Sequence, residues 1–175
     1  MNATSKILVI QLRRIGDALL ATPAVRLLKR VYPSATVDFL AEPQAADALA
    51  GNPHINEVIL YDKKHPLKAL WNIRNRGYDI VIDYMGNPRS GLITFLSGAP
   101  VKAGPGNVFW TCAYNKIMSL GEPPVYSSAE KIRMLEHIGI KNTGVSPLPA
   151  IYFLPEHKAW AEGILKTLGL SKEAP

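Results

Sequence analysis

The sequence predicts an α/β fold of the Rossmann-like kind, with a doubly wound parallel sheet covered by helices on both faces. Short apolar segments alternate with segments of helical spacing, which is typical of strand–helix–strand crossovers in a parallel sheet. Several strand segments are continuously apolar, as expected for strands buried on both faces. The chain has 175 residues, of which 47% are hydrophobic and 19% charged. This composition suits one buried core and excludes a disordered or fibrous chain.

The first strand–helix unit has the clearest pattern. Residues 6–12 are predicted as the first strand, whose continuously apolar part, residues 7–10, is followed by Gln11, Leu12 and then Arg13 and Arg14. In the segment that follows, apolar residues recur at helical spacing, with charged residues between them. We expect Thr22 and Pro23 to cap or kink this helix near its start.

Further units follow in the same order, each with a strand pattern and then a helix pattern. After a short fifth strand the pattern becomes less regular and includes a linker-like segment rich in Pro, Ser and Gly. The remaining predicted strands are residues 35–40, 55–61, 79–84 and 101–103, with a further candidate at 151–154, and the remaining predicted helices are 43–50, 67–75, 88–96, 112–118, 127–138 and 155–169.

The formal net charge of +6 is unevenly distributed along the chain. Residues 1–34 and 62–116 are basic, residues 35–61 are acidic, and the remainder is neutral. Since the carboxyl ends of parallel strands meet at one edge of a sheet, we expect both basic segments to contribute to one anion-facing cleft around the end of the first strand. The alternative is an ordinary solvated surface.

Several classes of protein find no support in the sequence. The single cysteine, Cys112, excludes a disulfide framework within the chain and fits a reducing compartment. No segment approaches the roughly 20 apolar residues of a membrane span, and the apolar run near the N-terminus is too short for a signal peptide. We therefore expect a cytoplasmic protein, which can still sit at a membrane surface.

Motifs for dinucleotides, ATP and metal ions are also missing. The only G-x-G, residues 104–106, meets Phe109 where a dinucleotide motif requires a third glycine, and there is no Walker loop. The four histidines are scattered, and Cys112 has no Cys or His at a short ligand interval. The sequence thus predicts neither a cofactor nor a metal site.

The strongest candidate for catalysis is Asp17. Ligands of open α/β sheets bind beyond the carboxyl ends of the strands, where Arg13, Arg14, Gly16 and Asp17 follow the first strand. Gly16 lets the backbone turn or approach a ligand closely. The helix N-terminus and two arginines favour the ionised form of Asp17, which can take a proton from a hydroxyl as a general base. The alternatives are that Asp17 is only a helix N-cap and that the arginines are merely solvated.

Polar and basic residues also follow the third and fourth strands. Lys63 and Lys64 come after the third strand, and Asn87 and Arg89 come after the fourth. Clustered cations at this edge predict phosphate or carboxylate groups on the substrate, and the alternative is an ordinary charged helix face. Nucleic acid is less favoured, because aromatic residues do not interleave with the basic ones.

Two segments, LVIQLRRIGDALLATPAVRLLKRVYP (8–33) and DIVIDYMGNPRSGLITFLSGAPVKAG (79–104), resemble glycosyltransferase family 9, the ADP-heptose:lipopolysaccharide heptosyltransferases. The resemblance runs from residue 6 to about residue 170. It implies the GT-B fold, in which two Rossmann-like domains face each other across a cleft, and this chain corresponds to the N-terminal, acceptor-binding domain.

The resemblance also implies a reaction. It is the inverting transfer of heptose from ADP-heptose to the inner core of lipopolysaccharide, without a metal or cofactor, at the cytoplasmic face of the inner membrane. The acceptor is an anionic, lipid-linked sugar, the lipid A core. Asp17 falls on the position of the family's general base. The residues assigned to the acceptor are Arg13, Arg14, Gly16, Lys63, Lys64, Asn87 and Arg89, of which Lys63 and Lys64 are assigned by position alone.

Two departures from the family pattern affect these expectations. Tyr126 stands roughly where family members often carry a histidine, so no role is assigned there. The motifs that hold the donor diphosphate are missing, so we expect residues 1–150 to form the acceptor-binding domain and 151–175 to begin an interdomain linker or helix. The chain alone is then expected to transfer no sugar. The alternative function is a non-catalytic Rossmann-like module that binds a phosphorylated small molecule or a protein partner.

Overall fold

The computed structural model describes residues 5–106, 109–119 and 123–170. Within these residues, six strands form one sheet in the order β3-β2-β1-β4-β5-β6, and every neighbouring pair is parallel. The strands are β1 (Lys6–Ile10), β2 (Thr36–Ala41), β3 (Glu57–Leu60), β4 (Ile80–Asp83), β5 (Val101–Pro105) and β6 (Lys116–Met118). The helices are α1 (Ile15–Val31), α2 (Pro43–Leu49), α3 (Pro66–Arg76), α4 (Pro88–Leu96), the 3-10 turn η1 (Thr111–Ala113), α5 (Ser127–Glu136) and α6 (Pro155–Thr167).

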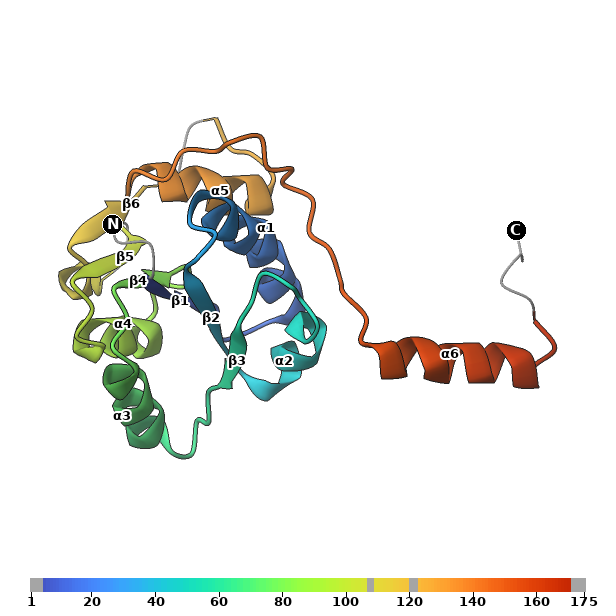
Figure 1. The fold of residues 1–175 in the computed structure, drawn as a ribbon. Helices are drawn as coiled ribbons and strands as arrows, with labels where there is room; N and C mark the ends of the chain where they lie inside the picture. Colours follow the sequence, from blue (N-terminus) through green and yellow to red (C-terminus); the bar gives the residue numbers. More distant parts are fainter. Residues whose placement is uncertain (1–4, 107–108, 120–122, 171–175) are drawn as a thin grey trace.

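Helices cover both faces of the sheet, and β1 lies at its centre (Figure 1). Successive side chains of a strand point to opposite faces. Ile7 and Val9 accordingly pack in a core with residues of α1, α2 and α5, whereas Leu8 and Ile10 pack in a second core with residues of α3 and α4. All four side chains are fully buried, which explains the unbroken apolar run of β1. The predicted Rossmann-like α/β class is confirmed.

Helix α1 begins earlier than its proline suggested. Pro23 lies well inside the helix rather than near its start. Proline has no N–H to donate to the carbonyl of Leu19, four residues earlier. The hydroxyl of Thr22 donates to that carbonyl instead, at 2.7 Å. This replacement bond allows the helix to continue through the proline, so the predicted cap near the helix start is wrong.

The region after β5 also differs from its prediction. A helix was expected over residues 112–118, but only the single turn η1 is helical, and β6 extends the sheet at its edge. The side chain of Asn115 holds this edge. It accepts a hydrogen bond from the Lys102 N–H at 2.8 Å and donates one to the Pro100 carbonyl at 2.7 Å. Pairing with β5 therefore overrides the local preference of this segment.

Helix α6 projects away from the sheet domain, and none of its residues is buried (Figure 1). The segment before it, residues 151–154, does not form the predicted strand. This segment contacts the domain near the end of α2, where the ring of Tyr152 meets the ring of His54 edge-on, with centroids 6.4 Å apart. The boundary expected near residue 150 stays a prediction.

Candidate functional site

A polar hollow of about 410 Å³ lies at the carboxyl edge of the sheet, beyond the ends of β1 and β4. Its position agrees with the general rule for ligand sites in open α/β sheets. Side chains from both strand ends, from the start of α1 and from α5 surround it. They are Gln11, Arg13, Arg14, Asp17, Tyr84, Met85, Asn87 and Lys131.

Asp17 is the carboxylate of this hollow. It is the third residue of α1, and the residue in the N-cap position is Arg14, so Asp17 is not the N-cap. The Asp17 side chain is half-buried. Within the described ranges, no hydrogen bond or ion pair engages its carboxylate. A half-buried carboxylate without a partner can accept a proton from a hydroxyl placed in the hollow.

The backbone turn before α1 is made by Arg14 rather than by Gly16. Arg14 has φ 62° and ψ 115°, and it has the only positive φ among the described non-glycine residues. A residue with a side chain rarely adopts this backbone conformation, because it costs free energy that the surrounding structure must offset. Gly16 does not have a positive φ, and nothing lies within 4 Å of where its Cβ would be. The expected turn at Gly16 is wrong, whereas the open space beside it leaves room for a ligand.

Lys131 is a cation of the hollow that sequence reasoning missed. Its ammonium donates to the side-chain oxygen of Gln11 at 3.1 Å and lies 4.8 Å from the centroid of the Tyr84 ring. The Tyr84 hydroxyl in turn donates to the Lys131 carbonyl at 3.0 Å. Burial lowers the pKa of Lys131, while the charges of Asp17 and Asp83 act in the opposite direction. No sequence signal could reveal this residue, because packing of α5 against α1 brings it to the site.

Three of the five predicted acceptor cations come together around a buried carboxylate, that of Glu42, just after β2. Glu42 pairs with Lys63 at 2.7 Å, with Arg89 at 3.2 Å and with Arg13 at 3.7 Å. We call these four residues the Glu42 cluster. The Glu42 side chain is only 7% exposed, whereas its three partners are more than a third exposed. The cluster therefore keeps a net positive charge and presents it outward.

The two basic segments thus share one sheet edge but are divided between two hollows. Lys63 and Lys64 line a second hollow of about 420 Å³ at the ends of β2 and β3, separate from the one that contains Asp17. Arg13 connects the two, since it lines the Asp17 hollow and pairs with Glu42. The sequence analysis assigned no role to Glu42, although this residue directly follows the second strand. A polar residue at the carboxyl end of a parallel strand is a reasonable candidate for a ligand site.

Asn87 has a structural role besides lining the hollow. Its side-chain oxygen accepts hydrogen bonds from the N–H groups of Arg89 and Ser90, at 3.0 and 2.9 Å, and the Ser90 hydroxyl accepts from the Asn87 N–H. This capping box fixes the start of α4. Arg89 is placed by this first turn, from which it reaches the Glu42 cluster.

Asp83 holds the loop between β4 and α4. Its carboxylate is fully buried and accepts hydrogen bonds from the N–H groups of Met85 and Gly86 and from the Tyr114 hydroxyl, at 2.8, 3.2 and 2.8 Å. Burial raises the pKa of Asp83, and these hydrogen bonds oppose that shift. The buried bonds give the carboxylate a structural role and orient the loop that carries Asn87.

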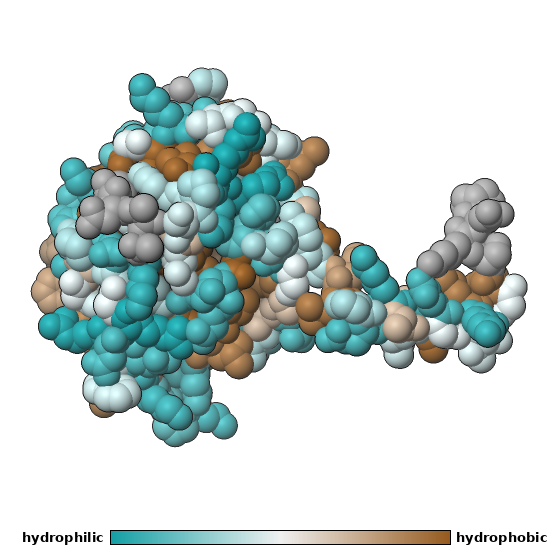
Figure 2. Space-filling model, in the orientation of Figure 1, coloured by the Kyte–Doolittle hydropathy of each residue, from teal (hydrophilic) through white to brown (hydrophobic). Residues whose placement is uncertain are grey.

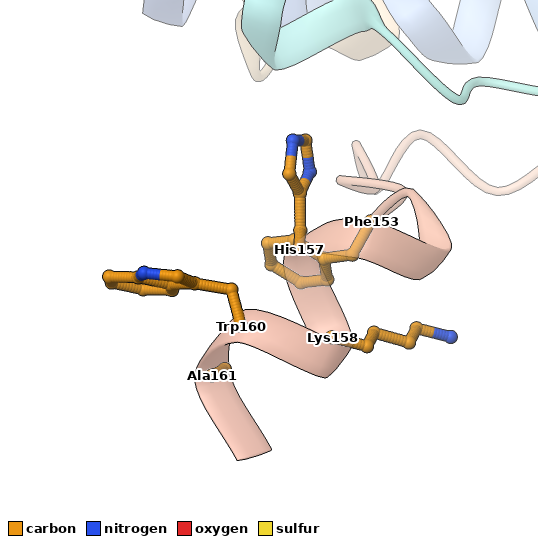
Figure 3. A pocket seen from close by; sticks show the side chains of 5 residues that line it. All are labelled: Phe153, His157, Lys158, Trp160 and Ala161. Carbon is orange, nitrogen blue, oxygen red and sulfur yellow. The ribbon is translucent and has the colours of Figure 1, made fainter. Parts of the chain in front are cut away.

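An apolar hollow of about 400 Å³ lies on α6, away from the sheet edge. Figure 3 shows that its lining side chains come from α6 and from Phe153 just before it. None of the predicted site residues lies there. The described ranges hold no group of three or more His, Cys, Asp or Glu side chains placed to share a metal ion. Among the described helices, none has both the length and the apolar character needed to cross a membrane.

Comparison of the sequence with known proteins finds lipopolysaccharide heptosyltransferases. Lipopolysaccharide heptosyltransferase 3 of Escherichia coli K12 is 35% identical over 81 residues, which covers 41% of this chain and 24% of that protein. Another lipopolysaccharide heptosyltransferase 3 from Escherichia coli is 27% identical over 156 residues, or 77% of this chain and 44% of that protein. No family model matches the chain.

Comparison of the fold finds solved glycosyltransferases. A glycosyltransferase family 9 structure from Veillonella parvula matches with a TM-score of 0.84 at 21% identity, covering 97% of this chain and 51% of that one. The Escherichia coli ADP-heptose lipopolysaccharide heptosyltransferase II matches with a TM-score of 0.77 at 21% identity, covering 97% and 52%. The chain thus spans about half of these structures and less than half of the curated relatives named above. The chain is thus similar in sequence to lipopolysaccharide heptosyltransferases over part of their length, and its fold is similar to that of one half of glycosyltransferases of family 9.

Proposed function

We propose that this chain is the acceptor-binding domain of an inverting glycosyltransferase that moves heptose from ADP-heptose to the inner core of lipopolysaccharide. The sequence relatives are named as lipopolysaccharide heptosyltransferases, which supports a transferase of this kind. Because the chain spans about half of the matched structures, we assign the binding of the donor diphosphate to groups outside these 175 residues.

The observation that carries the proposal is the Asp17 carboxylate. It sits in the first turn of α1, half-buried, in a polar hollow at the carboxyl edge of the sheet. Its freedom from hydrogen bonds and ion pairs among the described residues distinguishes it from Asp83 and Glu42 at the same edge. A general base needs such an available carboxylate within reach of the acceptor hydroxyl.

In the proposed reaction, Asp17 takes the proton of an acceptor hydroxyl as its oxygen attacks the anomeric carbon of the heptose. A new carbon–oxygen bond forms, and the bond from the anomeric carbon to the diphosphate oxygen breaks, so that ADP leaves with the electron pair. Attack from the face opposite ADP inverts the anomeric centre, and charge develops as in an oxocarbenium ion. Holding both substrates between two domains supplies proximity.

The cations at the sheet edge are proposed to hold the anionic acceptor. Arg13, Lys63 and Arg89 keep a net positive charge around Glu42, and Arg14 and Lys64 line the two hollows. Clustered guanidinium and ammonium groups suit the phosphate and carboxylate groups of a lipid A core. We place the working enzyme at the cytoplasmic face of the inner membrane, where such an acceptor is anchored.

The test is the change Asp17→Asn in the complete protein that contains this chain, with ADP release from ADP-heptose measured in the presence of a lipid A core acceptor. Loss of the base should lower kcat about 10²–10⁴-fold and leave thermal unfolding nearly unchanged. The matched control is Asp47→Asn, which removes the same charge from an exposed position of α2. If Asp17→Asn keeps the wild-type rate, the catalytic assignment is wrong and the non-catalytic binding module becomes the better explanation.

A further inference from the structure

Helix α3 and the end of β3 expose three large apolar side chains next to each other. Leu67 is 78% exposed, Trp71 is 71% exposed and Leu60 is 55% exposed. Leu67 and Trp71 are four residues apart and share one face of α3, whereas Ala69 and Ile73 pack the other face into the core. Leu60 and Trp71 line the same surface hollow of about 240 Å³. The core therefore does not account for these three side chains.

Lysines accompany these apolar side chains. Lys68 lies beside Leu67 and three residues before Trp71, and Lys64 lies in the loop just before α3. Among the described residues, neither lysine forms an ion pair. Asp62 accepts hydrogen bonds from His65 at 2.7 Å and from the Lys64 N–H at 2.8 Å, and the charge of Lys64 helps to lower the pKa of Asp62. Figure 2 shows hydrophilic side chains over α3 and the loop before it. The patch thus combines exposed leucine and tryptophan with a net positive charge, since Lys64 and Lys68 outnumber Asp62.

Helix α6 offers an internal comparison. Its Trp160 is 71% exposed, the same fraction as Trp71. The charges of α6 are mixed, however, because Glu156 and Glu162 alternate with Lys158 and Lys166. A tryptophan on a helix of mixed charge has no electrostatic preference for an anionic surface, whereas one beside unpaired lysines does.

We propose that the surface formed by Leu60, Leu67 and Trp71 with Lys64 and Lys68, here called the α3 patch, docks the protein on an anionic phospholipid membrane. Tryptophan and leucine would enter the headgroup region, and the lysines would contact the anionic headgroups. The patch adjoins the hollow that contains Lys63 and lies at the carboxyl edge of the sheet, so docking there would bring the Asp17 edge close to the bilayer. The proposal deepens the proposed function and rests on it only for the lipid-linked nature of the acceptor.

The experiment measures co-sedimentation of the full chain with vesicles that contain no acceptor, so its result does not depend on sugar transfer. Binding to phosphatidylglycerol–phosphatidylethanolamine vesicles should exceed binding to phosphatidylcholine vesicles and should weaken with added salt. The double change Leu67→Ala with Trp71→Ala should lower the partition coefficient about tenfold or more, and Lys68→Glu should lower it on anionic vesicles only. Circular dichroism confirms that each variant is folded.

The matched control is Trp160→Ala, which removes an equally exposed tryptophan and should leave binding unchanged. Equal losses for Trp71→Ala and Trp160→Ala, or no binding by the wild-type chain, would overturn the proposal. A dimer in sedimentation equilibrium that disappears in the Leu67 and Trp71 variant would also overturn it, because a second copy would then cover the patch. In the complete protein that contains this chain, loss of vesicle binding by the Leu67 and Trp71 variant with normal sugar transfer to a detergent-dispersed acceptor would support the α3 patch and leave the proposed function intact.

Discussion

Asp17 and Glu42 are carboxylates at the same edge of the sheet, yet their surroundings give them opposite properties. Glu42 is nearly buried and pairs with three cations that follow the ends of three different strands. Asp17 is half-buried and, in the described part of the chain, has neither a hydrogen bond nor an ion pair. The same chemical group is committed to structure in one place and available for proton transfer in the other. Nearness to the edge of the sheet alone therefore does not identify a catalytic carboxylate.

The largest expected difference between the two is in stability. Glu42→Gln should lower the free energy of unfolding by about 2 kcal/mol, which is below the cost of breaking a fully buried pair because the three cations are partly exposed. Asp17→Asn should change it by less than about 0.5 kcal/mol, as for a side chain without partners. Urea unfolding of both variants measures the two values, and equal losses would contradict the contrast.

Asp83 extends the comparison to a buried carboxylate held by hydrogen bonds. Its pKa is raised by burial, so at this group the folded chain holds its proton to a higher pH than the unfolded chain. This contribution to stability is complete below the unfolded pKa, about 3.9, and is lost as pH rises through the raised folded value. The amide side chain in the Asp83→Asn variant does not titrate. The stability advantage of the wild type over this variant should therefore shrink as pH rises from about 4 to 7. Urea unfolding across this range tests the sign, and an advantage that grows with pH would contradict it.

Asn87 tests whether an edge residue is structural or reserved for a ligand. Asn87→Ala removes the cap of α4 and should lower the free energy of unfolding by about 1 kcal/mol. The control, Asn75→Ala, changes an exposed asparagine of α3 and should have little effect. Thermal unfolding compares them, and if both variants unfold at the wild-type temperature, the capping box does not contribute to stability.

The smallest effect is expected at Glu57, which pairs with Arg76 through two hydrogen bonds of 2.6 and 2.8 Å. Because this carboxylate is about half exposed, Glu57→Gln should lower the free energy of unfolding by only about 0.5 kcal/mol. The Arg76 guanidinium lowers the pKa of Glu57, so this contribution is present above the unfolded pKa and disappears as pH falls through the folded value. Urea unfolding measures this value. If Glu57→Gln lowers the free energy of unfolding as much as Glu42→Gln does, burial is not the cause of the expected difference between the two glutamates.

The predicted elements agreed with the structure where side-chain pattern alone decides conformation. The unbroken apolar run of β1 follows from burial on both faces, and it placed Arg13, Arg14 and Asp17 correctly at the end of the first strand. Prediction failed where individual side-chain hydrogen bonds decide, because the apolar pattern does not reveal them. The edge pairing of β6 depends on Asn115, and the continuation of α1 depends on the Thr22 hydroxyl.

The sequence by itself determined the α/β class, because that class depends on local pattern and on the order of strands and helices. It also made the carboxyl edge the expected place of the site, and the family resemblance made Asp17 the candidate base. Only the tertiary structure decided that Arg13, Lys63 and Arg89 meet at Glu42 and that Lys131 enters the Asp17 hollow. These contacts join residues far apart in the chain, and their distances are set by how the strands are ordered and how α5 packs on α1. Electrostatic partners depend on those distances, which no sequence pattern contains.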